Sequence, residues 1–192
     1  MIESEKKILL TQKEYDFLKK HRFAAAKSSV QVNYYYDTDS FELNRKGITC
    51  RIREKDGICM ATIKEHRLRG DDCSVENSFP VKDCRDDSVF TNIGLSCKGS
   101  METLRSTYAP CVGVRAMLDC SAYLGITDYE LEIEYDRGKE KPSIDILEQI
   151  AAELAQNGFL PGQENFFSRI GRGKNKSERF FCRKAKAERH LT

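Results

Sequence analysis

Residues 2–10 read Ile2-Glu3-Ser4-Glu5-Lys6-Lys7-Ile8-Leu9-Leu10, with three ionisable side chains at alternate positions ahead of an apolar end. This pattern predicts a β-strand, in which residues two apart lie on the same face. One face would then carry Glu3, Glu5 and Lys7. A packed apolar core cannot accept that row without partners, because burying an unpaired charge is very costly. These side chains are therefore expected either in water or in a polar cavity that binds a metal ion and an anion.

Other predicted strands repeat the alternation, and each carries charges of one sign. Arg51 and Arg53 alternate in one strand, and Glu130, Glu132 and Glu134 alternate in another. For any single strand, the simplest interpretation is the solvated face of a half-exposed antiparallel sheet. However, three Glu on one face repel each other unless a cation neutralises them, and the opposite faces are only modestly apolar. A barrel with helices outside and a wet, charged lumen accommodates both features.

A lumen lined by acidic and basic clusters has a specific chemical meaning. Carboxylates bind Mg²⁺ or Mn²⁺, which prefer oxygen ligands, whereas Arg and Lys bind phosphate oxygens. Together these groups suit a polyphosphate chain bridged to a metal ion. Phosphoryl transfer then requires positioning, charge neutralisation and a metal-polarised water.

The rest of the sequence predicts one α+β domain, with no internal repeat and no linker. Helices are predicted from a Thr11–Glu14 capping box to about His21, and from Ser143 to Asn157, where apolar residues recur at helical spacing. Residues 84–107 are less regular, with a helix over 85–93 and a short helix or turn over 100–105; a last helix covers 163–170. Strands are predicted over residues 30–37, 48–54, 58–64, 74–81, 113–120 and 129–136.

Composition and cysteine usage limit the remaining classes. The chain has 192 residues, 32% of them charged, yet its net charge of +2 argues against a polyanion binder by bulk electrostatics. No apolar run approaches the about 18 residues of a membrane span. Because no secretory segment precedes the first strand, a cytoplasmic protein without a membrane partner is expected. The eight Cys and three His show no metal-ligand spacing, so we expect no zinc site and predict reduced thiols rather than a disulfide framework.

These motifs resemble, in order, those of the CYTH or triphosphate tunnel metalloenzyme superfamily. Glu3-x-Glu5-x-Lys7 is similar to the family's E-x-E-x-K signature, and the 129–134 segment is similar to its E-x-E-x-E strand. Between them, Tyr36-Asp37-Thr38, Arg51-Ile52-Arg53 and Thr62-Ile63-Lys64 resemble Y-D-T, R-x-R and T-x-K. The resemblance implies an α+β fold, an eight-stranded antiparallel β-barrel tunnel with helices packed outside. It covers a single domain of residues 1–172, followed by a basic C-terminal tail over residues 173–192.

The resemblance also implies which residues form the site. Mg²⁺ or Mn²⁺ would be bound by Glu3, Glu5, Glu130, Glu132 and Glu134. Phosphates would be bound by Lys7, Arg51, Arg53, Lys64, Arg105, Arg115 and Arg169, where Ser168-Arg169 stands in place of the family's S-K. The residues expected to act in catalysis are Glu5, Lys7, Lys64 and Glu132. Glu76 and Asp119 are further tunnel candidates, although the strand around Glu76 lacks one acid and the arginine of the family's R-x-E-x-E.

The implied activity is metal-dependent hydrolysis of triphosphates, either inorganic tripolyphosphate or a nucleoside or thiamine triphosphate. Two alternatives remain open: a class IV-type adenylate cyclase, in which the ribose 3′-hydroxyl attacks instead of water, and a non-catalytic polyphosphate or nucleotide-binding protein. The expected partner is a small triphosphate, nucleic acid is not expected, and a closed tunnel permits either a monomer or a homodimer. The tail carries seven Lys or Arg against two Glu, which predicts a solvated or disordered extension.

Overall fold

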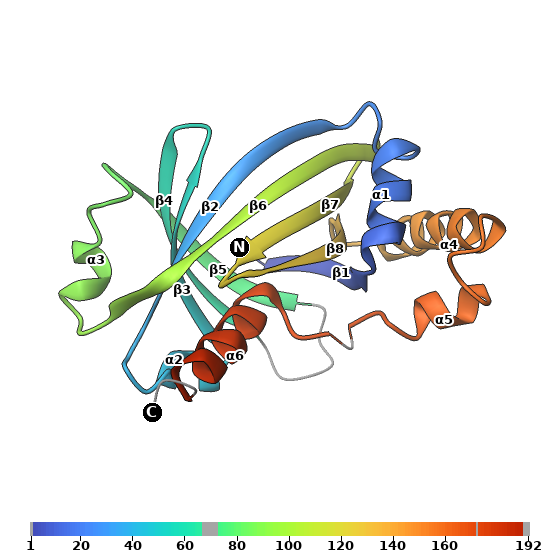
Figure 1. The fold of residues 1–192 in the computed structure, drawn as a ribbon. Coiled ribbons are helices and arrows are strands. Elements are labelled where there is room, and N and C mark those ends of the chain that lie inside the picture. Colours follow the sequence, from blue (N-terminus) through green and yellow to red (C-terminus); the bar gives the residue numbers. More distant parts are fainter. Residues whose placement is uncertain (1, 67–72, 172, 190–192) are drawn as a thin grey trace.

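Eight antiparallel strands form a closed barrel in the order β1-β5-β4-β3-β2-β6-β7-β8, and β8 pairs with β1 to complete it (Figure 1). The computed structural model describes residues 2–66, 73–171 and 173–189. The strands are β1 (Ile2–Leu10), β2 (Lys27–Asp37), β3 (Ile48–Lys55), β4 (Ile58–His66), β5 (Cys73–Val81), β6 (Ser96–Cys111), β7 (Val114–Tyr123) and β8 (Ile126–Tyr135). The predicted eight-stranded barrel is therefore confirmed.

Three helices pack against one side of the outer barrel wall. The α1 helix (Gln12–Lys20) begins with the predicted capping box between Thr11 and Glu14. It lies with α4 (Glu140–Gln156) and α5 (Gln163–Phe167) on the side of β1, β7 and β8 (Figure 1). Three further helices are α2 (Glu42–Arg45), α3 (Ser88–Thr91) and α6 (Lys176–Arg189).

Strand alternation separates an apolar outer layer from a polar lumen. On β8, Leu131 and Ile133 are 0% exposed and belong to the core cluster that contains Leu147 and Ile150 of α4. The intervening residues of β8 point the other way, because successive side chains of a strand alternate between its faces. The apolar core on β1, β7 and β8 therefore lies between the barrel wall and the helices, which leaves the inward face of these strands for charged groups.

A second core cluster covers the outer face of β3 and β4, and it is accompanied by a disulfide. Phe90 of α3 packs with Tyr36 and Ile52. Nearby, Cys59 on β4 is bonded to Cys84, with their Cα atoms 5.3 Å apart. Our expectation that all thiols are reduced is thus wrong for this pair. Its members lie 25 residues apart in sequence but close in space, because Cys59 is the register partner of Val81 at the end of β5.

Two further segments differ from the predictions. Residues 96–111 form one 16-residue strand, β6, where a short helix or turn was expected at 100–105, because β6 pairs with β2 on one side and β7 on the other. Residues 176–189 form α6 rather than a solvated or disordered extension. Its Phe180 and Phe181 are 0% and 3% exposed and pack with Tyr35 and Tyr123, so apolar burial holds this basic segment on the barrel.

No helix within the described residues is long and apolar enough to cross a membrane.

Candidate active site in the barrel lumen

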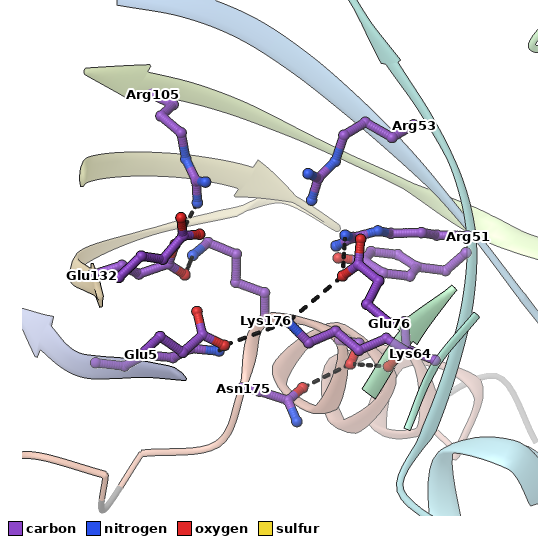
Figure 2. Close-up of a pocket in the computed structure, with 14 residues that line it drawn as sticks. Glu5, Arg51, Arg53, Lys64, Glu76, Arg105, Glu132, Asn175 and Lys176 are labelled. Atoms are coloured by element: carbon purple, nitrogen blue, oxygen red, sulfur yellow. Dashed lines mark hydrogen bonds and ion pairs between the residues drawn. The ribbon is translucent and has the colours of Figure 1, made fainter. Parts of the chain in front are cut away.

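The lumen contains a cavity that is lined mostly by polar and charged residues. Six cationic side chains and four carboxylates line it, so it carries an excess of positive charge. Figure 2 shows Glu5, Glu132 and Arg105 on one side and Arg51, Arg53, Glu76 and Lys64 on the other. The full lining is Glu5, Lys7, Tyr35, Thr49, Arg51, Arg53, Lys64, Glu76, Arg105, Glu132, Glu134, Asn175, Lys176 and Ser177.

Strand register brings these residues together. Lys7 lies opposite Glu132, and Glu5 opposite Glu134, across the β1–β8 pair. On the other side of the barrel, Lys64 is the register partner of both Thr49 on β3 and Glu76 on β5. Each inward face of a strand is thus aligned with that of its neighbour, so charges that are distant in sequence share one lumen.

The basic side is incompletely neutralised. Arg53 donates from Nε to Oδ1 of Asn33 at 2.8 Å and forms no ion pair with any described residue. Arg51 reaches Glu76 Oε2 at 3.4 Å, but its own Nε is buried without a hydrogen-bond partner in the described part of the chain. Burial and the neighbouring Arg51 and Arg105 lower the pKa of Arg53 to about 9. A bound anion would satisfy these guanidinium groups, which are suited to bidentate contact with phosphate.

The acidic side contains Glu5, Glu132 and Glu134. Glu5 Oε1 lies 2.7 Å from Lys7 Nζ and 3.4 Å from Lys64 Nζ. Burial would raise the pKa of Glu132, but nearby cations, Lys176 first among them, hold it well below its usual range. Burial raises the pKa of Glu134, so this carboxylate is the least stabilised as an anion.

The chemistry of these three carboxylates fits a divalent cation. They are oxygen donors from adjacent strands facing one cavity, and Glu132 lies close enough to Glu5 to raise its pKa by repulsion, which a cation would relieve. Each carboxylate is already paired with Lys or Arg. Within the described ranges, no three Asp, Glu, His or Cys side chains are gathered closely enough to hold an ion without moving.

Several predicted site residues lie behind the cavity wall or at its edge. Asp119 and Glu130 are 0% and 1% exposed; they do not line the cavity but pair with the cations that do. Arg115 has a side chain 67% exposed and pairs with Glu134 at 2.6 Å. The side chain of Glu3 lies outside the described residues.

Arg169 is not in the lumen, which corrects our prediction of a phosphate contact. Its guanidinium donates to Glu14 Oε1 at 2.7 Å and Oε2 at 3.0 Å, and to the carbonyl of Leu9. Glu14 belongs to α1, on the outer side of the barrel. Arg169 therefore ties α1 to the segment after α5.

The C-terminal cation in the lumen is Lys176, which sequence reasoning missed. It is the first residue of α6 and lines the cavity with Asn175 and Ser177. A local signal was present: Asn175 Oδ1 accepts from the Glu178 amide at 2.9 Å, and Glu178 Oε2 accepts from the Asn175 amide at 2.8 Å. This reciprocal capping box marks a helix start within the segment we had interpreted as a tail.

Known proteins are similar to this chain in sequence or in fold. YjbK of Bacillus subtilis (strain 168), which is named provisionally as a triphosphatase, is 30% identical over 200 residues that span 97% of each chain. A Bacillus halodurans crystal structure, named provisionally as an adenylate cyclase, matches with a TM-score of 0.64 and 24% identity over 93% of this chain and 97% of that chain. HpAC1 from Hippeastrum, a provisional adenylyl cyclase described as having a dominant triphosphatase activity, matches with a TM-score of 0.59 and 18% identity over 82% of this chain and 88% of its own. Since a sequence model of the CYTH domain matches residues 1–158 as well, the chain belongs to the CYTH domain family.

Proposed function

We propose that this protein is a metal-dependent hydrolase of triphosphates, acting with Mg²⁺ or Mn²⁺. The observation that carries the proposal is the pair Arg51 and Arg53, half-buried arginines that lack full neutralisation and face carboxylates across a cavity. An elongated polyanion with a bound cation matches both sides of this lumen. The charge excess of the lining favours such an anion over a neutral ligand.

The residues divide into two groups by chemistry. The phosphates would be bound and oriented by Arg51, Arg53, Lys64 and Arg105. Lys7 is placed to contact the same polyphosphate. Glu5, Glu132 and Glu134 would hold the divalent cation, which when bound neutralises charge and polarises a water. Lys7 and Lys64 lower the pKa of Glu5 against the effect of its burial, which keeps this carboxylate ionised as a cation ligand must be.

Hydrolysis is favoured over cyclisation by the character of the lining. Among the described lining residues, Tyr35 is the only aromatic, and it is 1% exposed because Phe180 and Phe181 pack against it. It does not offer a free face on which a base could stack. The names of YjbK and HpAC1 support the same activity. The proposed substrates are inorganic tripolyphosphate and the triphosphate end of a nucleoside or thiamine triphosphate.

The test is phosphate release from tripolyphosphate and from ATP with Mg²⁺ or Mn²⁺, with cyclic AMP measured in parallel. Glu132→Gln keeps the shape of the side chain but removes its charge, and it should abolish most of the activity. Glu102→Gln is the matched control, because Glu102 is exposed on β6 and does not line the cavity. Absence of phosphate release by the wild type, full activity in Glu132→Gln, or cyclic AMP in excess of phosphate would refute the proposal.

A further inference from the structure

A cation belonging to the chain itself sits within the buried acidic cluster beside the cavity. Lys176 Nζ lies 2.9 Å from Asp119 Oδ2 and 3.0 Å from Glu130 Oε1, and it also contacts Glu132 Oε1. The three carboxylates come from two adjacent strands, β7 and β8, and at most 5% of each residue is exposed. An ammonium group thus occupies the point where three buried carboxylates converge.

The fold holds Lys176 at this point. Ser177 Oγ hydrogen-bonds with Thr49 Oγ1 at 2.7 Å, and the ring of Phe180 lies 4.8 Å from that of Tyr35. These contacts fix the start of α6 against β3 and β2. A helix N-terminus is intrinsically unfavourable for a cation, so the position of Lys176 is stabilised by the carboxylates rather than by its own helix. The same carboxylates raise the pKa of Lys176 against the effect of its burial.

Charge balance indicates what this lysine replaces. The connected ion pairs include four carboxylates and three cations: Asp119, Asp128, Glu130 and Glu132 with Arg105, Lys176 and Arg179. Without Lys176, two negative charges would be left over within this ion-pair network. One divalent cation would balance them.

We propose that Lys176 is a built-in counter-cation, which fills the position that a second divalent ion would otherwise take. The lumen then binds a single divalent cation, on the side of Glu5 and Glu134. This inference rests on the proposed function only in requiring that the lumen bind a divalent cation at all. It assigns Lys176 to charge compensation on the acidic side of the lumen, separate from the Arg51 and Arg53 side that would bind phosphate.

The number of bound ions tests the inference directly. Mn²⁺ is titrated into the full chain without substrate, and bound ions are counted from the loss of the electron paramagnetic resonance signal of free Mn²⁺. We expect one Mn²⁺ per wild-type chain and two per chain of Lys176→Met. Lys184→Met is the matched control. Lys184 is on the same helix, but it lies outside the cluster and pairs with Glu188 at a distance of 3.7 Å. The Lys184→Met protein should bind one ion.

Each outcome is decisive. Two ions in the wild type, or one ion in a folded Lys176→Met, overturn the inference. Circular dichroism shows whether Lys176→Met folds. If it does not fold, the number of ions bound by the wild type decides alone: two ions refute the inference, and one ion supports it. Phosphate release from tripolyphosphate is measured on the same samples. Two ions with activity refute only the counter-cation, whereas no bound ion and no activity refute the proposed function as well.

Discussion

Arg105 on β6 and Asp119 on β7 are cross-strand partners joined by two hydrogen bonds, Nε to Oδ1 at 2.8 Å and Nη2 to Oδ2 at 2.6 Å. Arg105 lines the cavity and Asp119 does not. Asp119 is 0% exposed, so it acts on the lumen by fixing the orientation of the guanidinium. Arg105 also donates from Nη2 to Oε2 of Glu132, which does line the cavity, so a bound anion would share the guanidinium with that carboxylate.

Replacement of Asp119 by Asn should weaken substrate binding more than turnover. The amide has one acceptor oxygen and no charge, so Arg105 loses a bidentate, charge-assisted contact. We expect KM for tripolyphosphate to rise about tenfold, equivalent to about 1.4 kcal/mol, with a smaller change in kcat. Asp145→Asn, which alters an exposed pair with Lys141 on α4, is the control. An unchanged KM in Asp119→Asn would show that Arg105 needs no such support.

Arg53→Met should affect binding and stability in opposite directions. Arg53 is a half-buried cation without a carboxylate partner among the described residues, and its pKa is lowered mainly by burial, so it destabilises the folded state when no anion is bound. We expect the free energy of unfolding without ligand to increase by about 1 kcal/mol. KM for tripolyphosphate should rise at least about tenfold, because a charged phosphate contact is lost.

Urea denaturation without phosphate and steady-state kinetics measure these two effects of Arg53→Met. Arg85→Met, at an exposed position outside the barrel strands, is the matched control and should change neither quantity. A less stable Arg53→Met protein would mean that the hydrogen bond to Asn33 outweighs the cost of the unpaired charge.

Period-two patterns, which are local, indicated a barrel with a charged lumen, whereas the count of eight strands and the individual site residues came from the family resemblance. Glu132 and Arg53 lie on strands in which alternation of charged and apolar residues predicts the charged face. The pairing register then aligns the charged faces of neighbouring strands. The 16 residues of β6 were missed because Gly99 and the surrounding small and polar residues have low strand propensity. Hydrogen bonding to a strand on each side overrides that propensity.

The C-terminal part of the site depends on tertiary contacts that composition conceals. A segment with seven basic residues is typical of a solvated extension, yet burial of Phe180 and Phe181 decides its position. That burial places Lys176 in the lumen and leaves Arg169 to pair with Glu14 outside it. Likewise, the Cys59–Cys84 pairing depends on the β4–β5 register, whereas the prediction of reduced thiols rested on cell compartment alone.

The Glu14–Arg169 pair should contribute to stability and not to catalysis. Burial would raise the pKa of Glu14, but hydrogen bonds from Arg169 and Thr11 hold it below its ordinary value. Glu14→Gln should lower the free energy of unfolding at pH 7 by about 1–3 kcal/mol, because Arg169 loses its charged partner. Arg169→Ala should lower it similarly and leave KM for tripolyphosphate unchanged.

The direction of the Glu14 pKa shift predicts how the stability contribution of the Glu14–Arg169 pair depends on pH. Since the folded-state pKa of Glu14 is depressed, its contribution is present above its unfolded pKa of about 4.3 and is lost as pH falls through the folded value. The stability difference between wild type and Glu14→Gln should therefore shrink on acidification from about pH 5 to pH 3. A difference that is constant over this range, or a raised KM in Arg169→Ala, would contradict the placement of the pair outside the site.

The Cys59–Cys84 disulfide should stabilise the barrel without taking part in hydrolysis. It joins β4 to the segment after β5 and closes a loop with a sequence separation of 25. Constraining an unfolded loop of that length stabilises the folded state by about 3 kcal/mol. Cys59→Ser should lose about that free energy of unfolding, and dithiothreitol should produce the same loss in the wild type but none in Cys59→Ser.

Neither cysteine lines the cavity, so phosphate release at a temperature where both forms are folded should not change. Cys111→Ser, at an exposed free thiol, is the control; a wild-type stability that does not respond to the reductant would mean that the two thiols are not bonded in solution.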